Sequence, residues 1–410
     1  MFLDLLRRRN PEFVKTAISL HQAGQIPANC YVLDLDTVEK NARHMKQEAD
    51  KNGLKVFAMT KQVGRYPGMS QALIAGGIDA AVAVDMQCAR AACAGGLRLG
   101  HVGHLVQVPR FEADTAASLR PDYWTVFSYE KAQEASQATL KRNARTGSTT
   151  KQRILVRIHA PGDRFYNGHE GGFAAETIVE VARKIDALPG CQFAGITSFP
   201  ALLFDDAQSQ VKPTPNLATL HHAKVQLAAA GFAHMEINAP GTTSSALFDA
   251  LAQAGATQVE PGHGLTGTTP LHARQDLAEL PALLYLSEVS HFHQERAYCF
   301  GGGLYIDPVF PDYTVRAVIS ATPTVAEAAL YPVDIPPAQA IDYYGMAHAS
   351  SVQVKSGDSV VFGFRPQAFI TRAFVVGIRG LHSGQPVVGP TYNAQGWPEP
   401  WPGVVTGAPT

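Results

Sequence analysis

The stretch Val56-Phe57-Ala58-Met59-Thr60-Lys61 decides the predicted fold, because a short apolar run of strand character ends directly at a lysine. Comparable runs recur between residues 31 and 259 and alternate with longer stretches of helical period, which predicts a parallel sheet built from βα units. The expected strands are Tyr31–Leu35, Val56–Thr60, Ala80–Val84, Arg98–Val106, Tyr123–Phe127, Ile154–Ile158, Phe193–Ser198, Met235–Asn238 and Thr257–Val259. Eight or nine such repeats, without a Gly-rich first turn, favour an α/β (β/α)8 TIM-like barrel over an open Rossmann sheet.

Two helices of this region are the clearest. The first is predicted to begin at Asp36, whose carboxylate would cap the helix while Glu39 reaches back to the cap. Its expected buried stripe is Val38, Ala42, Met45 and Ala49. The second lies between the strands Ile154–Ile158 and Phe193–Ser198, with the stripe Ile178, Val181, Ala182 and Ile185. Strand, helix and strand therefore follow in the order that a barrel needs.

The pattern changes after about residue 276. Strand-like runs are now separated by Gly and Pro turns, with little helical period, at Leu283–Leu286, Tyr313–Ile319, Ser359–Phe364 and Ala373–Ile378. We expect a helical extension over residues 1–30, the barrel over 31–275 and a C-terminal all-β domain over 276–410. The Gly- and Pro-rich end from Pro386 is expected to wrap loosely.

The composition excludes several classes of protein. With 410 residues, 46% hydrophobic and 17% charged, the chain is folded throughout and is no small disulfide-rich module. A formal charge of -1 gives no field for nucleic acid or a membrane surface. The apolar runs are too short to span a bilayer, and Met1–Leu6 is too short for a signal peptide, so we expect a cytoplasmic protein. Five scattered cysteines without a C-x-x-C pair indicate reduced thiols.

Residues that follow the predicted strands are the candidates for chemistry, because barrel active sites lie at strand ends. Lys61 would face the barrel mouth, where desolvation lowers the pKa of an amine and makes it a nucleophile toward a carbonyl carbon. From its position alone it is as readily a solvated surface lysine. The Gly-rich turn at residues 259–267 and the hydroxyl-rich loop at residues 241–245 offer backbone amides to a phosphate, although each alone is more often an ordinary loop.

Several strings resemble those of one enzyme family. Tyr31-Val32-Leu33-Asp34-Leu35-Asp36, Met59-Thr60-Lys61-Gln62 and Glu260-Pro261-Gly262-His263 are similar to the barrel of alanine-racemase-type (fold type III) pyridoxal phosphate enzymes. The YhfX-like branch of this family is resembled over nearly the whole chain, through Gly103-His104-Leu105-Val106-Gln107, Asn238-Ala239-Pro240, Gly262-His263-Gly264-Leu265-Thr266-Gly267-Thr268 and Tyr298-Cys299-Phe300-Gly301-Gly302-Gly303. The resemblance implies the fold and the cofactor, pyridoxal 5'-phosphate, more firmly than the reaction.

The resemblance also implies roles for single residues. Lys61 would form the Schiff base with the cofactor and later move the Cα proton of the substrate. The phosphate would be held by Gly262, His263, Gly264, Thr242, Thr243 and Tyr344, with Tyr343 as a replacement for the last. His104 and Ser198 close two other strands and would line the cofactor ring, although a strand-end histidine is as often structural.

Glu260 marks a departure from alanine racemase, which has an arginine at the corresponding point. A carboxylate hydrogen-bonded to the pyridine nitrogen favours its protonated form and deepens the electron sink for a Cα carbanion. Decarboxylases of the same fold share the Glu260-Pro261-Gly262 turn, so decarboxylation stays open as a reaction.

Racemisation needs a second acid/base, which this family takes from the β domain of the partner subunit, so the resemblance implies a homodimer with sites at the interface. Tyr298 and Cys299, which precede the Gly301-Gly302-Gly303 run, are the candidates, although each could equally be a packing residue. Arg164 is the candidate to bind the substrate carboxylate through its forked guanidinium group.

The leading hypothesis is that the protein is a pyridoxal phosphate-dependent amino-acid racemase. The alternatives are a fold type III decarboxylase, a non-catalytic cofactor carrier and a metal-dependent barrel hydrolase. A metal is not expected, since neither His291 with His293 nor His221 with His222 has a third ligand at proper spacing. The stretch from Arg365 to Phe369 contains neither His nor Cys, which argues against the metal-assisted aldolase and dehydratase branch of the family.

Overall fold

A computed structural model describes residues 1–306, 310 and 313–401, and the chain forms two compact units. The unit called here the barrel unit comprises residues 44–59 and 77–262. The other, called the β unit, comprises residues 1–43 and 60–76 and the chain from His263 onward. The expected division into domains at residues 30 and 275 stays a prediction.

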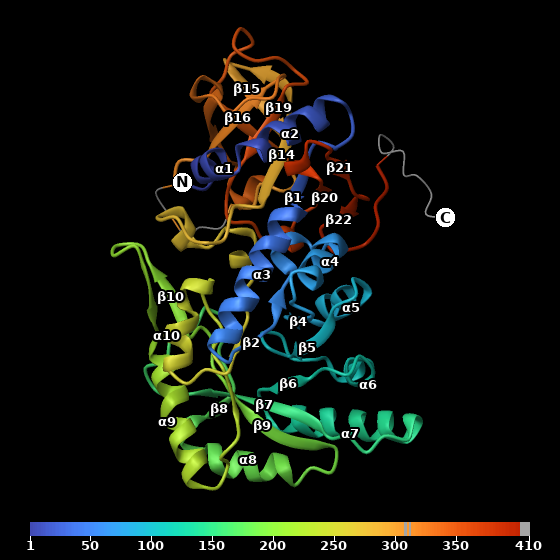
Figure 1. The fold of residues 1–410 in the computed structure, drawn as a ribbon, viewed down its shortest axis with the longest axis vertical. Coiled ribbons are helices and arrows are strands. Elements are labelled where there is room, and N and C mark those ends of the chain that lie inside the picture. Colours follow the sequence, from blue (N-terminus) through green and yellow to red (C-terminus); the bar gives the residue numbers. More distant parts are fainter. Residues whose placement is uncertain (307–309, 311–312, 402–410) are drawn as a thin grey trace. The chain divides into compact units, whose positions relative to one another are not determined.

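The barrel unit contains a ring of parallel strands (Figure 1). Its order is β2 (Lys55–Val56), β13 (Gln258–Val259), β12 (Glu236–Asn238), β9 (Cys191–Thr197), β7 (Gln152–His159), β6 (Tyr123–Val126), β5 (Arg98–Val102), β4 (Ala80–Ala83) and β3 (Ala58–Met59). β2 pairs with β13 and β3 pairs with β4, and β2 and β3 are halves of one extended run, so the ring closes. The predicted α/β barrel is thereby confirmed.

Helices cover the outside of this ring (Figure 1). They are α5 (Met86–Ala94), α6 (Ala113–Ser118), α7 (Tyr129–Thr146), α8 (Ile178–Asp186), α9 (Pro215–Ala229) and α10 (Phe248–Gln253). The predicted stripe of α8 is confirmed, because all four of its apolar side chains are buried. Short additions are β8 (Phe173–Ala174), which pairs with β7, and the hairpin of β10 (Leu202–Asp205) and β11 (Gln210–Pro213).

One predicted barrel strand belongs elsewhere. Strand β1 (Cys30–Asp34) pairs antiparallel with β14 (Leu283–His293) and parallel with β20 (Phe374–Arg379), so the placement of Tyr31–Leu35 in the barrel is wrong. All five residues of β1 are buried, as in a barrel strand, so its composition does not reveal which sheet it joins.

Helix α3 (Leu35–Lys51) follows β1, and its predicted stripe is buried. The predicted cap is wrong by two residues. Asp34 Oδ1 accepts a hydrogen bond from the Thr37 backbone N–H at 3.1 Å, which is the geometry of an N-cap. Asp36 instead accepts from the Gly380 N–H at 2.7 Å and pairs with Arg379, so its carboxylate ties the helix to the chain after β20.

The β unit contains a largely antiparallel sheet, which confirms the predicted all-β region. Its order is β15 (Arg296–Phe300), β18 (Tyr344–Ala347), β17 (Leu330–Asp334), β16 (Arg316–Ser320), β19 (Ser359–Phe362), β14, β1, β20 and β21 (Val387–Val388), and β22 (Tyr392–Asn393) also pairs with β20. Strands β15, β17 and β18 were not predicted. The segment after Pro386 was expected to wrap loosely, but β21 and β22 are hydrogen-bonded to the sheet; residues 402–410 lie outside the described part.

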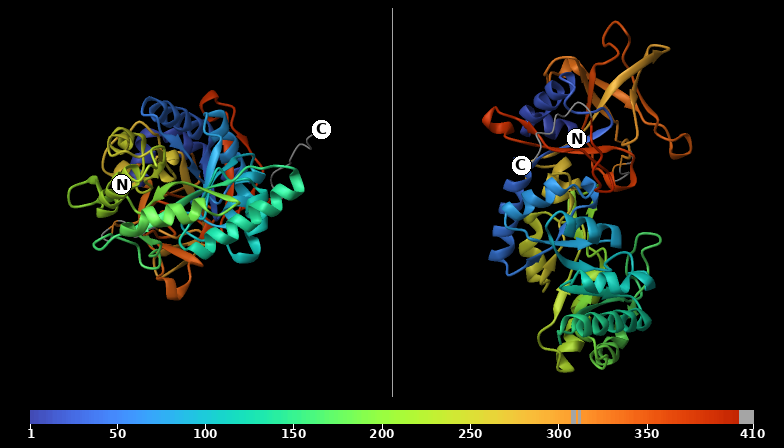
Figure 2. Two further views of the ribbon diagram at one scale, coloured as in Figure 1. Left: turned by 90° about the horizontal axis from the view of Figure 1, so that it is seen from below. Right: turned by 90° about the vertical axis from the view of Figure 1, so that its right-hand side faces the viewer.

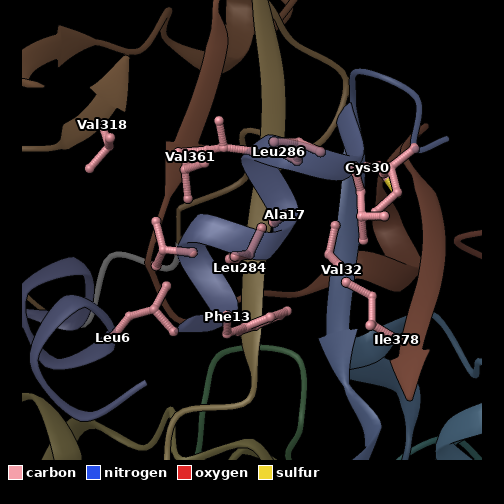
Figure 3. Close-up of a cluster of buried hydrophobic side chains, with 14 of the residues drawn as sticks. Leu6, Phe13, Ala17, Cys30, Val32, Leu284, Leu286, Val318, Val361 and Ile378 are labelled. Carbon is pink, nitrogen blue, oxygen red and sulfur yellow. The ribbon is translucent and has the colours of Figure 1, made fainter. Parts of the chain in front are cut away.

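The N-terminal residues form α1 (Phe2–Arg9) and α2 (Pro11–Gln22), which lie against this sheet (Figure 2). Side chains from α1, α2 and five strands form one buried apolar cluster (Figure 3), whose members include Leu6, Phe13, Ala17, Val32, Leu284, Val318, Val361 and Ile378. The helices thus supply one wall of the core of the β unit. Across the described residues, the helices are too short or too polar to cross a lipid bilayer.

Phe13 tests this packing. Its side chain is 0% exposed, so Phe13→Ala should leave a cavity and lower the free energy of unfolding of the β unit by about 3–5 kcal/mol. Chemical denaturation followed by fluorescence measures the change. Phe111→Ala is the matched control, because Phe111 is 94% exposed and its truncation should cost less than about 0.5 kcal/mol. Equal effects of the two substitutions would contradict this description of the core.

Candidate active site

Lys61 lies where the sequence places it, directly after the extended run that ends with β3 and Thr60. It begins a 3-10 turn (Lys61–Val63) and is half-buried. Its Nζ lies 4.9 Å from the ring centroid of Phe369, and Arg65 Cζ lies 5.6 Å from the same ring. The Phe369 ring face therefore stabilises two neighbouring cations.

His263 lies in the same environment, at the start of the turn His263–Thr266. Burial lowers the pKa of His263 well below its ordinary value, and the positive charges of Arg365, Lys61 and His272 lower it further. The imidazole is therefore neutral at neutral pH. Lys61 and Arg365 thus supply the positive charge of this region and His263 supplies a neutral ring.

Glu260 follows β13 directly, and its side chain is 1% exposed. Its Oε1 lies 2.5 Å from His101 Nδ1 and accepts a hydrogen bond from Asn238 Nδ2 at 2.9 Å. Its Oε2 lies 3.2 Å from His104 Nε2. These partners come from β5, from the turn after β5 and from β12, so the closed ring of strands is what assembles them.

Further bonds fix the partners of Glu260. His101 Nε2 lies 2.6 Å from Thr125 Oγ1, which holds the far side of the ring. Thr197 Oγ1 donates to Asn238 Oδ1 at 2.7 Å, so the amide turns its nitrogen toward Glu260. His101 and Asn238, which orient the Glu260 carboxylate, are thus held in place by Thr125 and Thr197.

The pKa of Glu260 is lowered in spite of complete burial. Burial alone raises it, but the nearby His104 and His101 and the hydrogen bonds from His101 and Asn238 together outweigh that effect. Glu260 is therefore ionised at neutral pH, and an ionised carboxylate in the barrel interior needs positive or donor groups around it.

Comparisons with known proteins agree on the family. A model of the alanine racemase N-terminal domain matches residues 33–270, and a model of the YhfX-like C-terminal domain matches residues 284–388. The chain is also 38% identical to the uncharacterized protein YhfX of Escherichia coli K12, over 97% of this chain and 99% of that protein. The chain belongs to the YhfX-like, alanine-racemase-type family. Proteins of this fold family bind pyridoxal 5'-phosphate, the cofactor expected from the sequence.

Solved structures show the same fold. D-threonine aldolase from Filomicrobium marinum is similar with a TM-score of 0.65 at 17% identity, over 90% of this chain and 96% of that chain. D-threo-3-hydroxyaspartate dehydratase from Delftia sp. HT23 has a TM-score of 0.61 at 16% identity, over 88% and 96%. Alanine racemase from Clostridium difficile 630 has a TM-score of 0.61 at 14% identity, over 90% and 99%. These neighbours catalyse different reactions, so the fold alone does not assign one.

The residues present fit the family's cofactor. Glu260 Oε2 is buried, and it lies 3.2 Å from His104 Nε2 without a hydrogen bond to it. A carboxylate oxygen has two lone pairs, so Oε2 can accept a hydrogen bond from a donor on a bound ring. A protonated pyridine nitrogen is such a donor. In the β unit, Lys61 stays the predicted amine for the aldehyde of the cofactor.

The Glu260 group also has the composition of a metal site. Ligand atoms of His101, His104 and Glu260 lie within 4.8 Å of one another. However, both nitrogens of His101 already lie within hydrogen-bond distance of Glu260 and Thr125, and Glu260 Oε1 has two partners. These polar contacts already bind most of the atoms that an ion would need, and we interpret the group as a holder of the carboxylate.

Other expected cofactor ligands have protein partners. Ser198 Oγ, after β9, accepts from Asn216 Nδ2 at 3.1 Å. The Thr243 hydroxyl donates to Gly241 O at 3.0 Å, and the Thr242 N–H donates to Leu202 O at 3.1 Å. Gly264 is buried within the turn that His263 begins, and Gly262 precedes it. Phosphate binding by these residues stays a prediction.

The side chains of Tyr298 and Cys299, the candidates for the second acid/base, have different surroundings in the β unit. Tyr298 on β15 stacks on His291 with ring centroids 4.7 Å apart, and the Tyr344 ring lies 6.2 Å from it. Cys299 lies on the opposite face of the strand and is 0% exposed, with its Sγ donating to Gly345 O at 3.4 Å. Burial raises the pKa of the Cys299 thiol to about 12. The structure thus brings Tyr298 and Tyr344 together and places Cys299 in the core.

Arg164 is exposed, and its backbone is held by Asn216. Its N–H donates to Asn216 Oδ1 at 2.9 Å, and its carbonyl accepts from Asn216 Nδ2 at 3.1 Å. Its role as a substrate fork stays a prediction.

Four residues around Glu260 were not predicted as site residues, namely His101, Thr125, Thr197 and Asn238. His101 precedes His104 by three residues, and that pair of imidazoles at one strand end was an available signal.

The pKa of Glu260 gives a pH-dependent prediction. Because the pKa is lowered in the folded state, the ionised carboxylate stabilises the fold above its ordinary pKa, and this stabilisation is lost as the pH falls through the lowered value. The difference in free energy of unfolding between wild type and Glu260→Gln should therefore be largest at pH 7 and shrink between about pH 5 and pH 3.

Glu288→Gln is the matched control, since burial raises the pKa of Glu288. Its stabilising contribution should fall as the pH rises, which is the opposite trend. Denaturant titrations across pH measure both differences. A wild-type advantage over Glu260→Gln that does not change with pH would contradict the assignment of an ionised Glu260.

Proposed function

We propose that this protein is a pyridoxal phosphate-dependent amino-acid racemase that acts at Cα. The observation that supports cofactor chemistry at Cα is Glu260, an ionised carboxylate buried in the barrel whose Oε2 contacts His104 Nε2 at 3.2 Å and can accept a further donor. When bound, pyridoxal phosphate withdraws electrons from Cα of an attached amino acid and so acidifies its Cα–H bond. Glu260 would hold a proton on the ring nitrogen and strengthen that withdrawal.

Lys61 would bind the cofactor covalently through Nζ. The same Nζ would accept the Cα proton of the substrate on one face. Tyr298 would return a proton to the opposite face, from the β unit of a partner subunit in a homodimer. A proton removed on one face and returned on the other inverts Cα without any other change, which is racemisation.

The choice of Tyr298 over Cys299 rests on burial. Cys299 is enclosed and its pKa is raised to about 12, which disfavours it as an acid/base for a ligand, whereas Tyr298 is half-buried. A cysteine donor was one support for the decarboxylase alternative. That alternative keeps the support of the Glu260-Pro261-Gly262 turn, and it differs from racemisation in its product.

Attachment of the cofactor is tested by hydride trapping. Borohydride reduction of the loaded protein should fix the cofactor on the peptide that contains residue 61, seen by mass spectrometry. Lys61→Ala should lose both the visible absorption and the modified peptide, because the amine is missing. Lys151→Ala, at an exposed lysine, is the control and should behave as wild type. Trapping at another lysine, or none in the wild type, would refute the proposed function.

The reaction is tested by incubating the loaded protein with a panel of amino acids in heavy water. Racemisation predicts deuterium at Cα without loss of carbon dioxide, and decarboxylation predicts loss of mass. Tyr298→Phe should lower racemisation by about 10²-fold or more, because a positioned acid/base contributes that much. Cys299→Ser should change it far less. A spectrum that no amino acid perturbs would instead indicate a cofactor carrier.

A further inference from the structure

The amino end of the barrel unit carries a pocket that the proposed function does not use. Its volume is about 440 Å³, which is large enough for a small-molecule ligand. Its walls come from the chain before β6, the start of β7, the end of α7 and the turn after α7 (Figure 1), and they include Arg120, Arg142 and Arg153. Glu260 follows β13, so this pocket and the Glu260 group lie at opposite ends of the parallel strands.

Arg142 is the most enclosed of the three arginines, and it is 7% exposed. Its Nε and Nη2 donate to Asn143 Oδ1 at 3.2 Å and 2.9 Å, and Nη2 also donates to Thr150 O at 3.0 Å. These acceptors are neutral, so they orient the guanidinium without cancelling its charge. The C-terminal end of a helix such as α7 contributes only about half of an elementary negative charge, which is less than the charge of one arginine.

Arg120 brings a second positive charge near Arg142. Burial lowers the pKa of Arg142, and the charge of Arg120 lowers it further. Arg120 has a φ of +52°, in the left-handed region that residues other than glycine rarely occupy. In the part of the chain that the structure describes, Arg120 pairs with no carboxylate. The fold therefore holds two like charges near each other, and a bound anion would stabilise them.

The carboxylate in this pocket is already paired. Asp122 is the single acidic residue among the described residues of the lining, and its Oδ2 pairs with Arg98, which is not part of the lining. Its Oδ1 lies 4.0 Å from Arg153 Nη2, a long contact. Arg153 is held mainly by neutral groups, because Nη1 donates to the Tyr123 hydroxyl at 3.0 Å and Nε donates to Asp122 O at 3.2 Å. Positive charge therefore exceeds negative charge in the pocket.

We propose that this pocket binds the phosphate group of a small molecule. A guanidinium presents paired N–H donors that match two oxygens of a phosphate, and three arginines can balance its double charge. Thr150 also lines the pocket, and its hydroxyl can donate a further hydrogen bond. Inorganic phosphate and a phosphate ester share this chemistry. Arg153 contacts the Tyr123 hydroxyl, which donates to Glu236, so a bound anion would strengthen the contacts at the amino ends of the strands.

The test measures the binding of inorganic phosphate and of glycerol phosphate by isothermal titration calorimetry. The protein is first loaded with pyridoxal phosphate and freed from excess, so that the site for the cofactor's own phosphate is filled. Arg142→Gln and Arg120→Gln should each weaken binding by about tenfold or more, because a charged donor is lost. Arg145→Gln is the matched control. Arg145 is exposed on the same helix and is not part of the lining, so its loss should change the dissociation constant by less than about twofold.

Thermal unfolding gives a second measurement, which keeps the test decisive if Arg142→Gln does not fold. A ligand that binds only the folded protein raises the unfolding temperature, so phosphate should stabilise the wild type and Arg145→Gln but not Arg120→Gln. Tighter binding of the ester than of inorganic phosphate would place an organic group in the pocket, and equal or weaker binding would assign the site to inorganic phosphate. A wild type that binds neither probe, or equal binding by the wild type and Arg120→Gln, would overturn the inference.

Discussion

The site depends on one constraint, which is that a carboxylate is kept ionised inside the barrel. Transfer of the ionised Glu260 carboxylate from water to the protein interior is unfavourable in free energy unless charged groups or hydrogen-bond donors replace the lost hydration. His101, His104 and Asn238 supply these groups from β5, from the turn after it and from β12. Since Glu260 itself follows β13, the carboxylate is held only when these strands have closed into a ring. The groups that keep Glu260 ionised therefore come together only in the closed barrel.

The sequence predicted the parts of this arrangement that are local. Lys61 and Glu260 could be proposed as site residues because each directly follows an apolar run, and the buried stripe of α8 follows from its helical period. His101 could not be assigned to Glu260, because 159 residues separate them and only the closed ring brings them together. For the same reason β1 was assigned to the wrong sheet: a fully buried strand has the same composition in either sheet.

The strands of the β unit show a second limit of sequence reasoning. β15 and β18 are only half-buried, so their apolar patterns are weak, and Tyr298 and Cys299 were equal candidates as neighbours in the chain. A strand sends neighbouring side chains to opposite faces. Once β15 is paired with β14 and β18, one face holds the ring of Tyr298 against His291 and the other encloses the thiol of Cys299. The difference in burial thus distinguishes Tyr298 from Cys299, which their adjacent positions in the sequence could not do.

Charge inside the barrel unit is balanced differently at its two ends. Near the amino ends of the strands, Glu236 pairs with Lys55 and accepts from the Tyr123 hydroxyl, so a lysine balances the charge of this carboxylate. In TIM barrels this end serves stability, whereas function belongs to the carboxyl ends. There the ionised Glu260 is surrounded by donors from β5, from the turn after β5 and from β12. The carboxylate that pairs with a lysine thus lies at the end that serves stability, and the carboxylate held by two histidines and an amide lies at the end that serves function.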